Sequence, residues 1–142
     1  MAGLESARIM MPHKADVNRD RFIYLASPYS HPLSTVRYQR FELVCRIAGK
    51  MMIDGLVVFS PIAHTHPIAE LCVLPSSWNY WHKYDEVMIL GSYKVIVACI
   101  DGWRESKGVT AEIEIAHQHG IPVEYLEISG DQFTIKKTPP EG

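Results

Sequence analysis

The stretch YKVIVACIDGWRESKGVTAEIEIAHQHGIPVEYL, residues 93–126, decides the fold. It begins with the most hydrophobic run of the chain, Tyr93–Ile100, whose apolar residues follow one another without alternation, as in a strand buried on both faces. A polar turn follows, then a segment of helical periodicity that Gly120 ends, then the apolar run Pro122–Leu126. Strand, helix and strand in this order predict a parallel pair joined by a crossover helix.

The rest of the chain alternates in the same way. Residues 61–77 are the exception, because they are too polar and too rich in proline for one clean element and are predicted to form a long loop, with at most a helical turn at Ile68–Cys72. The predicted strands are Phe22–Ala26, Leu56–Ser60, Tyr93–Ile100, Pro122–Leu126 and, at an edge, Gln132–Lys137. The predicted helices are 34–54, 78–90 and 109–119.

This order of elements predicts an α/β protein, a three-layer sandwich of the Rossmann or flavodoxin-like type with a parallel sheet of about four to five strands. We expect a loosely held extension at residues 1–20, a single α/β domain at residues 21–137 and a tail at residues 138–142. In such sheets, ligands bind beyond the carboxyl ends of the strands. The loops Ser27–His31, Pro61–Pro67 and Asp101–Gly108 emerge at that end.

Composition limits the function classes. The chain has 142 residues and a net charge of −2 at pH 7, so it has no basic excess of the kind that holds nucleic-acid polymers or membrane surfaces. It contains no apolar run near the length of a bilayer span, and its first residues do not have the pattern of a secretion signal. Three cysteines without CxxC spacing favour a reduced, cytoplasmic protein.

Glu112 lies where its helix should be apolar. On a helical wheel at about 100° per residue it falls in the middle of the arc that holds Val109 and Ala116, whereas Glu114 falls on the opposite side. Burying an ionised carboxylate costs several kcal/mol unless it is paired. Glu112 either snorkels or supports the first turn of the helix, or it is a catalytic carboxylate that faces a pocket, and we favour the second interpretation.

Three motifs resemble those of a known enzyme superfamily: YLASPYSHP at residues 24–32, VFSPIAHTHP at residues 58–67 and GWRESKGVTAE at residues 102–112. Together with Asp85 and the pattern Gly108-x-x-x-Glu112, they resemble the nucleoside 2-deoxyribosyltransferase-like superfamily over about residues 22–126. The resemblance is to a branch related to nucleoside 5′-monophosphate N-glycosidases. It implies retaining cleavage or transfer at an N-glycosidic bond, without a cofactor.

The resemblance also implies three catalytic residues. A Glu at the position of Glu112 attacks the anomeric carbon and forms a glycosyl–enzyme intermediate, and a Tyr at the position of Tyr24 orients it. An Asp at the position of Asp85 contacts or protonates the departing base, which requires a raised pKa or a hydrogen-bonded proton. Glu112 falls in the first turn of a helix that begins near Val109, so we expect the helix dipole to keep it ionised. The alternatives are an ordinary core residue for Tyr24 and a surface residue for Asp85.

The residue at position 106 helps to distinguish a nucleoside substrate from a nucleoside 5′-monophosphate. Superfamily members that act on free nucleosides have an Asp six residues before the nucleophile, whereas those that cleave nucleoside 5′-monophosphates have a Ser there, as this chain does. A hydroxyl beside helix N–H groups can donate to a phosphate that a carboxylate would repel. We expect Ser27, Ser30 and His31 to complete an anion-binding set, with Gly108 beside them. The alternative for Ser106 is a simple helix cap.

His64 and His66 suggest a different function from the one that the resemblance implies. Two His at this spacing in an extended segment can share a metal, so a metal-dependent hydrolase is one alternative function. We favour contacts to substrate hydroxyls, or loop packing, for this pair. The surplus aromatic residues of 78–84 predict either a pocket wall or a dimer interface. A non-catalytic nucleotide sensor is a further alternative, and the resemblance implies a homo-oligomer, a dimer or tetramer.

Overall fold

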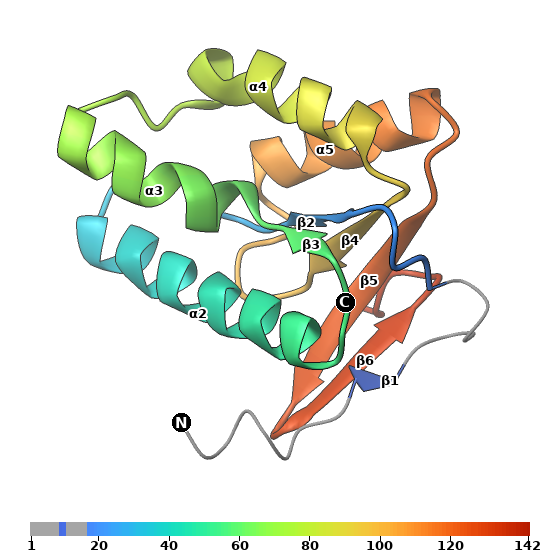
Figure 1. Ribbon diagram of the computed structural model, residues 1–142. Coiled ribbons are helices and arrows are strands. Elements are labelled where there is room, and N and C mark those ends of the chain that lie inside the picture. Colours follow the sequence, from blue (N-terminus) through green and yellow to red (C-terminus); the bar gives the residue numbers. More distant parts are fainter. Residues whose placement is uncertain (1–8, 11–16) are drawn as a thin grey trace.

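The computed structural model describes residues 9–10 and 17–142, and in them the chain forms one sheet with helices on both faces (Figure 1). The strands are β1 (Ile9–Met10), β2 (Ile23–Ala26), β3 (Val58–Phe59), β4 (Lys94–Ala98), β5 (Val123–Ser129) and β6 (Gln132–Lys136). The helices are α2 (Ser34–Ile53), α3 (Pro61–Cys72), α4 (Trp78–Gly91) and α5 (Lys107–Gln118). This architecture confirms the predicted α/β sandwich.

The sheet has the strand order β1-β6-β5-β4-β2-β3. Strands β3, β2, β4 and β5 pair in parallel, as predicted, whereas β6 returns antiparallel to β5. The edge position predicted for β6 is wrong, because β1 pairs with its outer side. After β2 the chain moves to β3 on one side and then crosses back to β4 on the other. The order therefore reverses between β2 and β4, which is where such sheets bind ligands.

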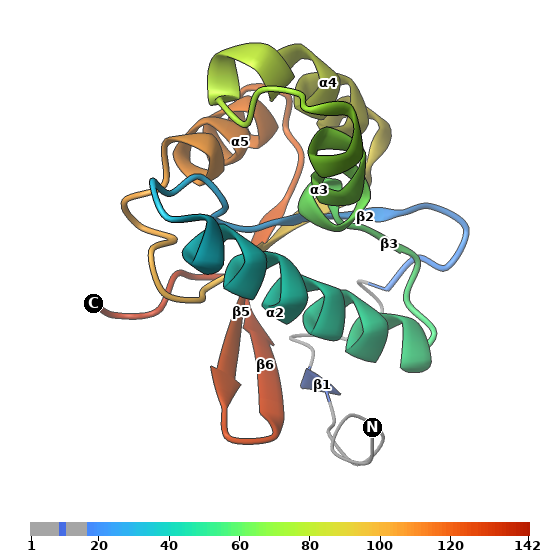
Figure 2. The ribbon, with the colours of Figure 1, turned by 90° about the vertical axis from the view of Figure 1, so that its left-hand side faces the viewer.

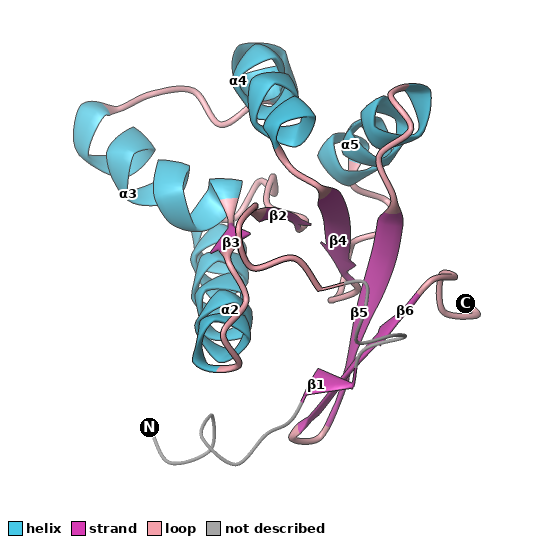
Figure 3. Ribbon diagram, turned by 45° about the vertical axis from the view of Figure 1, so that its right-hand side comes forward, coloured by secondary structure: helices cyan, strands magenta, loops and turns pink. Residues whose placement is uncertain are grey.

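Two apolar layers cover the central strands. Ile23 and Leu25 of β2 pack on the face that α2 covers, whereas Tyr24 and Ala26 pack on the face of α4 and α5 (Figure 3). All four side chains are buried, because both faces of this strand lie inside the molecule. Figure 2 shows α2 on one side of the sheet, and the β5–β6 hairpin extending past it. The central strands thus place Tyr24 towards α5.

The loop predicted at residues 61–77 is wrong over most of its length, because Pro61–Cys72 is helix α3. Pro61 occupies the first position of the helix, where its missing N–H costs nothing, and the Ser60 hydroxyl accepts a hydrogen bond from the Ala63 N–H at 3.1 Å. The proline read as a breaker therefore starts the helix. Only residues 73–77 remain as a connection to α4.

The N-terminal extension predicted at residues 1–20 lies partly outside the described residues, which omit 1–8 and 11–16. Ile9–Met10 belongs to the sheet as β1. The Asn18 N–H donates to the Tyr93 hydroxyl at 3.0 Å, so residues close to the predicted domain start contact its body. In the tail predicted at residues 138–142, the Pro140 carbonyl accepts a hydrogen bond from Arg104.

Two observations on the described residues bear on membrane spans and on the cysteines. None of their helices has both the length and the apolar character that crossing a membrane requires. Cys45, Cys72 and Cys99 are all free thiols.

Candidate active site

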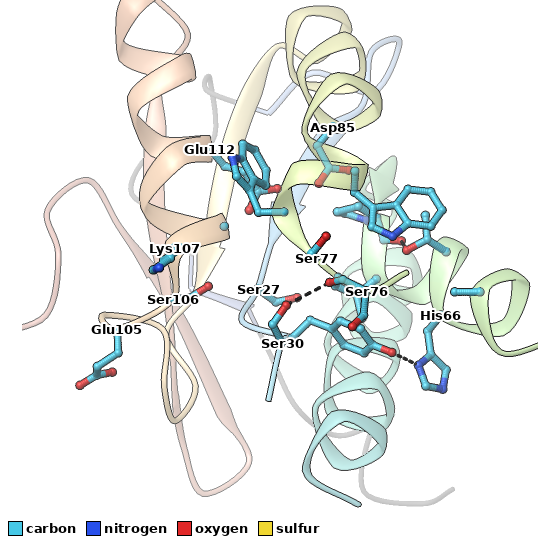
Figure 4. Close-up of a pocket in the computed structure, with 18 residues that line it drawn as sticks. Ser27, Ser30, His66, Ser76, Ser77, Asp85, Glu105, Ser106, Lys107 and Glu112 are labelled. Carbon is cyan, nitrogen blue, oxygen red and sulfur yellow. Dashed lines mark hydrogen bonds between the residues drawn. The ribbon is translucent and has the colours of Figure 1, made fainter. Parts of the chain in front are cut away.

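A cavity of about 400 Å³ opens at the carboxyl ends of β2 and β4, at the reversal of strand order (Figure 4). The loops that follow both strands line it, as the sequence predicted, together with residues of α3, α4 and α5. Its lining residues fall into a carboxyl end, with Glu112 and Asp85, and a hydroxyl end with several serines. Figure 4 shows the two ends facing each other across the cavity.

Three buried polar residues make up the carboxyl end. Tyr24 is fully buried, Glu112 is 4% exposed and Asp85 is 8% exposed. The Tyr24 hydroxyl donates a hydrogen bond to Glu112 Oε2. Tyr24 comes from the centre of β2, Glu112 from α5 and Asp85 from the middle of α4, so three separate elements bring these groups together.

The inward position of Glu112 follows from the phase of α5. Val109, Glu112 and Ala116 are the buried residues of this helix, the arc that the helical wheel predicted. The helix starts earlier than predicted, at Lys107, with Ser106 as N-cap accepting from the Val109 N–H at 3.2 Å. Glu112 therefore lies in the second turn. The first-turn position from which the helix dipole would keep it ionised is wrong, because that effect fades beyond the first turn.

Burial has the largest effect on the pKa values of Tyr24, Asp85 and Glu112 at the carboxyl end of the cavity. It raises the pKa of Asp85 to about 7, against smaller opposing effects of the Tyr24 hydroxyl and His82. Burial and the nearby Asp85 raise the pKa of Glu112 well above its ordinary value, and the hydrogen bond from Tyr24 offsets this rise only in part. Burial also raises the pKa of Tyr24 well above its ordinary value, so Tyr24 stays a donor at neutral pH. Coupled carboxyls in so dry a site resist ionising together, so a proton is retained between them.

The two carboxyls differ in their hydrogen bonds. Glu112 accepts from Tyr24, which favours its charged form. Asp85 Oδ1 is buried and has no hydrogen-bond partner among the described residues, which favours its neutral form. The arrangement can therefore hold one carboxylate and one carboxylic acid in the same cavity, which are the protonation states of a nucleophile and a general acid.

The hydroxyl end contains three serines that the sequence predicted and two that it did not. Ser27, Ser30 and Ser106 line the cavity, joined by Ser76 and Ser77 from the connection between α3 and α4. Ser27 is 6% exposed, and its Oγ has no hydrogen-bond partner among the described residues. Ser30 Oγ donates to the Ser76 carbonyl at 3.1 Å, which ties the two loops together.

Gly108 and His31, which were also predicted to bind substrate, differ in their position relative to the cavity. Gly108 lines the cavity, and a Cβ built on it would meet Ser106 and Trp78 only at ordinary contact distances of 3.8 Å. His31 does not line the cavity. Its Nδ1 instead accepts a hydrogen bond from the Leu33 N–H at 3.0 Å, at the start of α2. The structure therefore gives His31 a local role in the chain turn before that helix.

His64 and His66 do not act as a pair, because they lie in a helix and not in an extended segment. Residues two apart in a helix point in nearly opposite directions. His66 lines the cavity and its Nδ1 lies 2.5 Å from the Tyr29 hydroxyl, whereas His64 lies against Phe59 and Tyr84. In the part of the chain that the structure describes, no group of three or more His, Cys, Asp or Glu residues is arranged to hold a metal ion.

Aromatic side chains form a wall that the site prediction did not include. Trp78, Trp81 and Tyr29 line the cavity, and Trp81 Nε1 donates to the Pro75 carbonyl at 2.7 Å. The surplus of aromatic residues at the start of α4 was the signal for a pocket wall. Tyr80 and Tyr84 of the same helix are exposed instead, so only one side of α4 faces the cavity.

Comparison with protein families gives one match that covers most of the chain. A family model described as a domain of unknown function, DUF1937, matches residues 21–128. The chain belongs to this family. Every residue that lines the cavity falls within the DUF1937 match, so the site is part of the family domain. A search of curated proteins found no match to the sequence.

Proposed function

We propose that the protein cleaves the N-glycosidic bond of a nucleoside or nucleoside 5′-monophosphate, or transfers its glycosyl group, through a covalent intermediate on Glu112. One observation carries this proposal: Glu112 is buried at the cavity, accepts a hydrogen bond from Tyr24 and shares the cavity with a second buried carboxyl, Asp85. The resemblance of the motifs supplies the reaction class. The division into a charged and a neutral carboxyl supplies the two chemical roles that this reaction needs.

In the first step, a Glu112 oxygen attacks C1′ of the sugar as the bond from C1′ to the base nitrogen breaks. The electron pair of that bond leaves with the base, and Asp85 donates its proton to the base. Glu112 becomes a glycosyl ester and Asp85 becomes a carboxylate. Asp85 Oδ1 suits this role because no described residue occupies its hydrogen-bonding position.

In the second step, a water molecule, or a nitrogen of a second base, gives its proton to Asp85 and attacks C1′. The ester bond breaks, and its electron pair returns to Glu112, which restores both starting protonation states. Water gives the free sugar or sugar phosphate, and a second base gives a new nucleoside. Tyr24 remains protonated throughout and holds Glu112 in place through its hydrogen bond.

We also propose that the protein is a homo-oligomer, as the resemblance implies. The outer side of α4 supports this, since it exposes Tyr80, Val87 and Leu90 by 49%, 57% and 43% of their surfaces. Scattered exposed apolar residues are ordinary, but a stripe along one helix suits a protein contact. Analytical ultracentrifugation tests the association, and a sedimenting monomer at high concentration would contradict it.

The direct test is base release. Purified protein is incubated with each common nucleoside, deoxynucleoside and 5′-monophosphate, and free base is measured by chromatography. We expect release by the wild-type protein and none by the Glu112→Gln variant, which keeps the shape of the side chain but removes the nucleophile. If neither protein releases base while both bind a nucleotide, the cavity is that of a non-catalytic sensor.

A further inference from the structure

Arg40 of α2 contacts the cavity wall from outside the cavity. Its Nη1 donates hydrogen bonds to two backbone carbonyls of the loop after β2, that of Ser30 at 2.9 Å and that of Tyr29 at 3.4 Å. Tyr29 and Ser30 line the cavity, whereas Arg40 does not. Arg40 therefore holds this part of the wall through the backbone, and leaves the side chains of the loop free to face a ligand.

The same guanidinium group lies against Gly102 in the loop after β4. A Cβ built on Gly102 would overlap Arg40 Nη2 and lie 3.2 Å from its Cζ. Gly102 also has a φ of +90°, which residues with a side chain rarely adopt. This position therefore requires glycine both for its backbone and for the close approach of Arg40. Gly102 is the first residue of the motif at residues 102–112, and these contacts account for a glycine there.

Each of the two loops leads to further parts of the cavity lining. The loop after β4 continues into Glu105 and Ser106, which both line the cavity. On the other side, Ser30 Oγ donates to the Ser76 carbonyl at 3.1 Å, in the connection between α3 and α4 (Figure 4). The contacts of Arg40 with the two loops, which we call the Arg40 bridge, therefore belong to a chain of contacts that joins three lining segments.

The chemistry of arginine suits this bridge. Its guanidinium group is planar and carries donors on separate nitrogens, so Nη1 can bind carbonyls of one loop while Nη2 and Cζ lie against the other. A lysine has a single ammonium group on a flexible stem and cannot do both. Arg37 of the same helix donates to the carbonyls of His31 and Pro32, and the three atoms nearest to a Cβ at Gly102 all belong to Arg40.

We propose that Arg40 is a positioning residue, which joins the loop after β2 to the loop after β4 and so sets the width of the cavity at its hydroxyl end. Loops that are already held at one spacing do not have to be ordered when a ligand binds, and this strengthens binding. Arg40 lies outside the cavity that contains Glu112 and Asp85, so it should affect binding more than the chemical step. The inference rests on the proposed function only where binding is measured through the reaction.

Hydrogen–deuterium exchange tests the Arg40 bridge without a ligand. In Arg40→Lys, the amides of residues 101–106 and of residues 29–31 should exchange about fivefold faster or more, because the two loops no longer support each other. Arg37→Lys is the control on the same helix, and it should leave exchange at residues 101–106 unchanged. Unchanged exchange at residues 101–106 in Arg40→Lys would overturn the inference.

Ligand affinity tests the consequence for the site. Nucleosides and nucleoside 5′-monophosphates are titrated by calorimetry into Glu112→Gln, with and without Arg40→Lys. The affinity for those that bind should fall about tenfold, while the thermal midpoint falls by no more than about 5 °C. In base release, Arg40→Lys should raise KM about tenfold and change kcat about twofold or less. Faster exchange with unchanged affinity, or a loss confined to kcat, would overturn the positioning role.

Gly102→Ala breaks the Arg40 bridge from its other side. The added Cβ displaces the guanidinium group, so affinity and exchange should change as in Arg40→Lys. Adding Gly102→Ala to Arg40→Lys should lower the affinity by less than about twofold further, because the bridge is already lost. Gly120→Ala is the control for backbone strain, since Gly120 has a φ of +67° and nothing within 4 Å of its Cβ. It should leave ligand affinity unchanged, and additive effects of Gly102→Ala and Arg40→Lys would contradict the bridge.

The bridge and the proposed reaction fail separately. Base release by the wild-type protein, with exchange and KM unchanged in Arg40→Lys, would support the reaction and contradict the bridge. Faster exchange and weaker ligand binding in Arg40→Lys, without base release by the wild-type protein, would support the bridge and contradict the reaction.

Discussion

The Tyr24 hydroxyl donates its hydrogen bond to Glu112, a residue 88 positions away in the sequence, and so joins the centre of β2 to a residue of α5 that lines the cavity. Asp85, the other carboxyl at that end, has a buried oxygen without any partner among the described residues. Burial raises the pKa of both carboxyls, and we propose that this asymmetry leaves Glu112 as the carboxylate and Asp85 as the carboxylic acid. Tyr24 is therefore the residue on which the division of roles between Glu112 and Asp85 depends.

Replacing Tyr24 by Phe should lower kcat for base release about ten- to a hundredfold, because the hydrogen bond that favours the Glu112 carboxylate is lost. The pKa of Glu112 should rise further, so the acid limb of the pH profile should move to higher pH. Tyr125→Phe is the matched control, since Tyr125 of β5 lies in the same apolar cluster as Tyr24, and no hydrogen bond joins it to Glu112 among the described residues. An unshifted acid limb in Tyr24→Phe would contradict the role given to Tyr24.

The activity of the wild-type protein should decline above about pH 7. Burial raises the pKa of Asp85 to about 7, and the general acid must be protonated to serve the departing base. Asp85→Asn should lower the rate and remove this alkaline limb from the pH profile of kcat. Steady-state base release between pH 5 and 9 measures both effects, and a limb that survives in the variant would belong to another group.

Asp85 should also make stability depend on pH. Its folded pKa of about 7 exceeds the ordinary aspartate value of 3.8, so the folded state holds a proton that the unfolded state loses. The contribution of Asp85 is fully present below pH 3.8 and is lost as the pH rises through about 7. Asp85→Asn should therefore raise the thermal midpoint at pH 8 and leave it nearly unchanged at pH 4. A midpoint raised equally at both pH values would show that charge is not the cause.

Val73 offers a stability test outside the site. It ends α3 in the left-handed conformation, with φ of 53° and 88% of its surface exposed, which is a costly position for a β-branched residue. Val73→Gly should raise the free energy of unfolding by about 1 kcal/mol, since relief of this strain outweighs the greater freedom of glycine when unfolded. Chemical denaturation measures the change, with Val87→Gly inside α4 as a destabilising comparison.

The fold was predictable from the sequence because its central strands are buried on both faces. Tyr24 and Leu25 pack on opposite sides of β2, so the apolar run is continuous and easy to recognise. Helix α3 was missed because the polar residues and prolines of 61–77 favour a loop. A proline at the first helical position, with Ser60 capping the helix, has the opposite meaning.

The site was predictable only where periodicity or a motif marked it. Glu112 stood out because its helix places it among apolar residues, and the resemblance drew attention to Asp85 and Tyr24. The surplus of aromatic residues at 78–84 indicated a pocket wall, which Trp81 forms, but nothing local marked Ser77, which the short connection between α3 and α4 brings to the cavity. His31 was included for its loop position, but its imidazole is used by the backbone of Leu33.

The covalent intermediate is the most direct test of the proposed reaction. Protein quenched with acid during turnover, then digested and analysed by mass spectrometry, should carry a glycosyl or glycosyl-phosphate mass on the peptide that contains Glu112. The adduct should be absent from Glu112→Gln, and in Asp85→Asn it should persist longer if the base is a good leaving group, because proton removal from water is impaired. Base release at full rate with Glu112→Gln, or an adduct on a different residue, would contradict the assignment of Glu112 as the nucleophile.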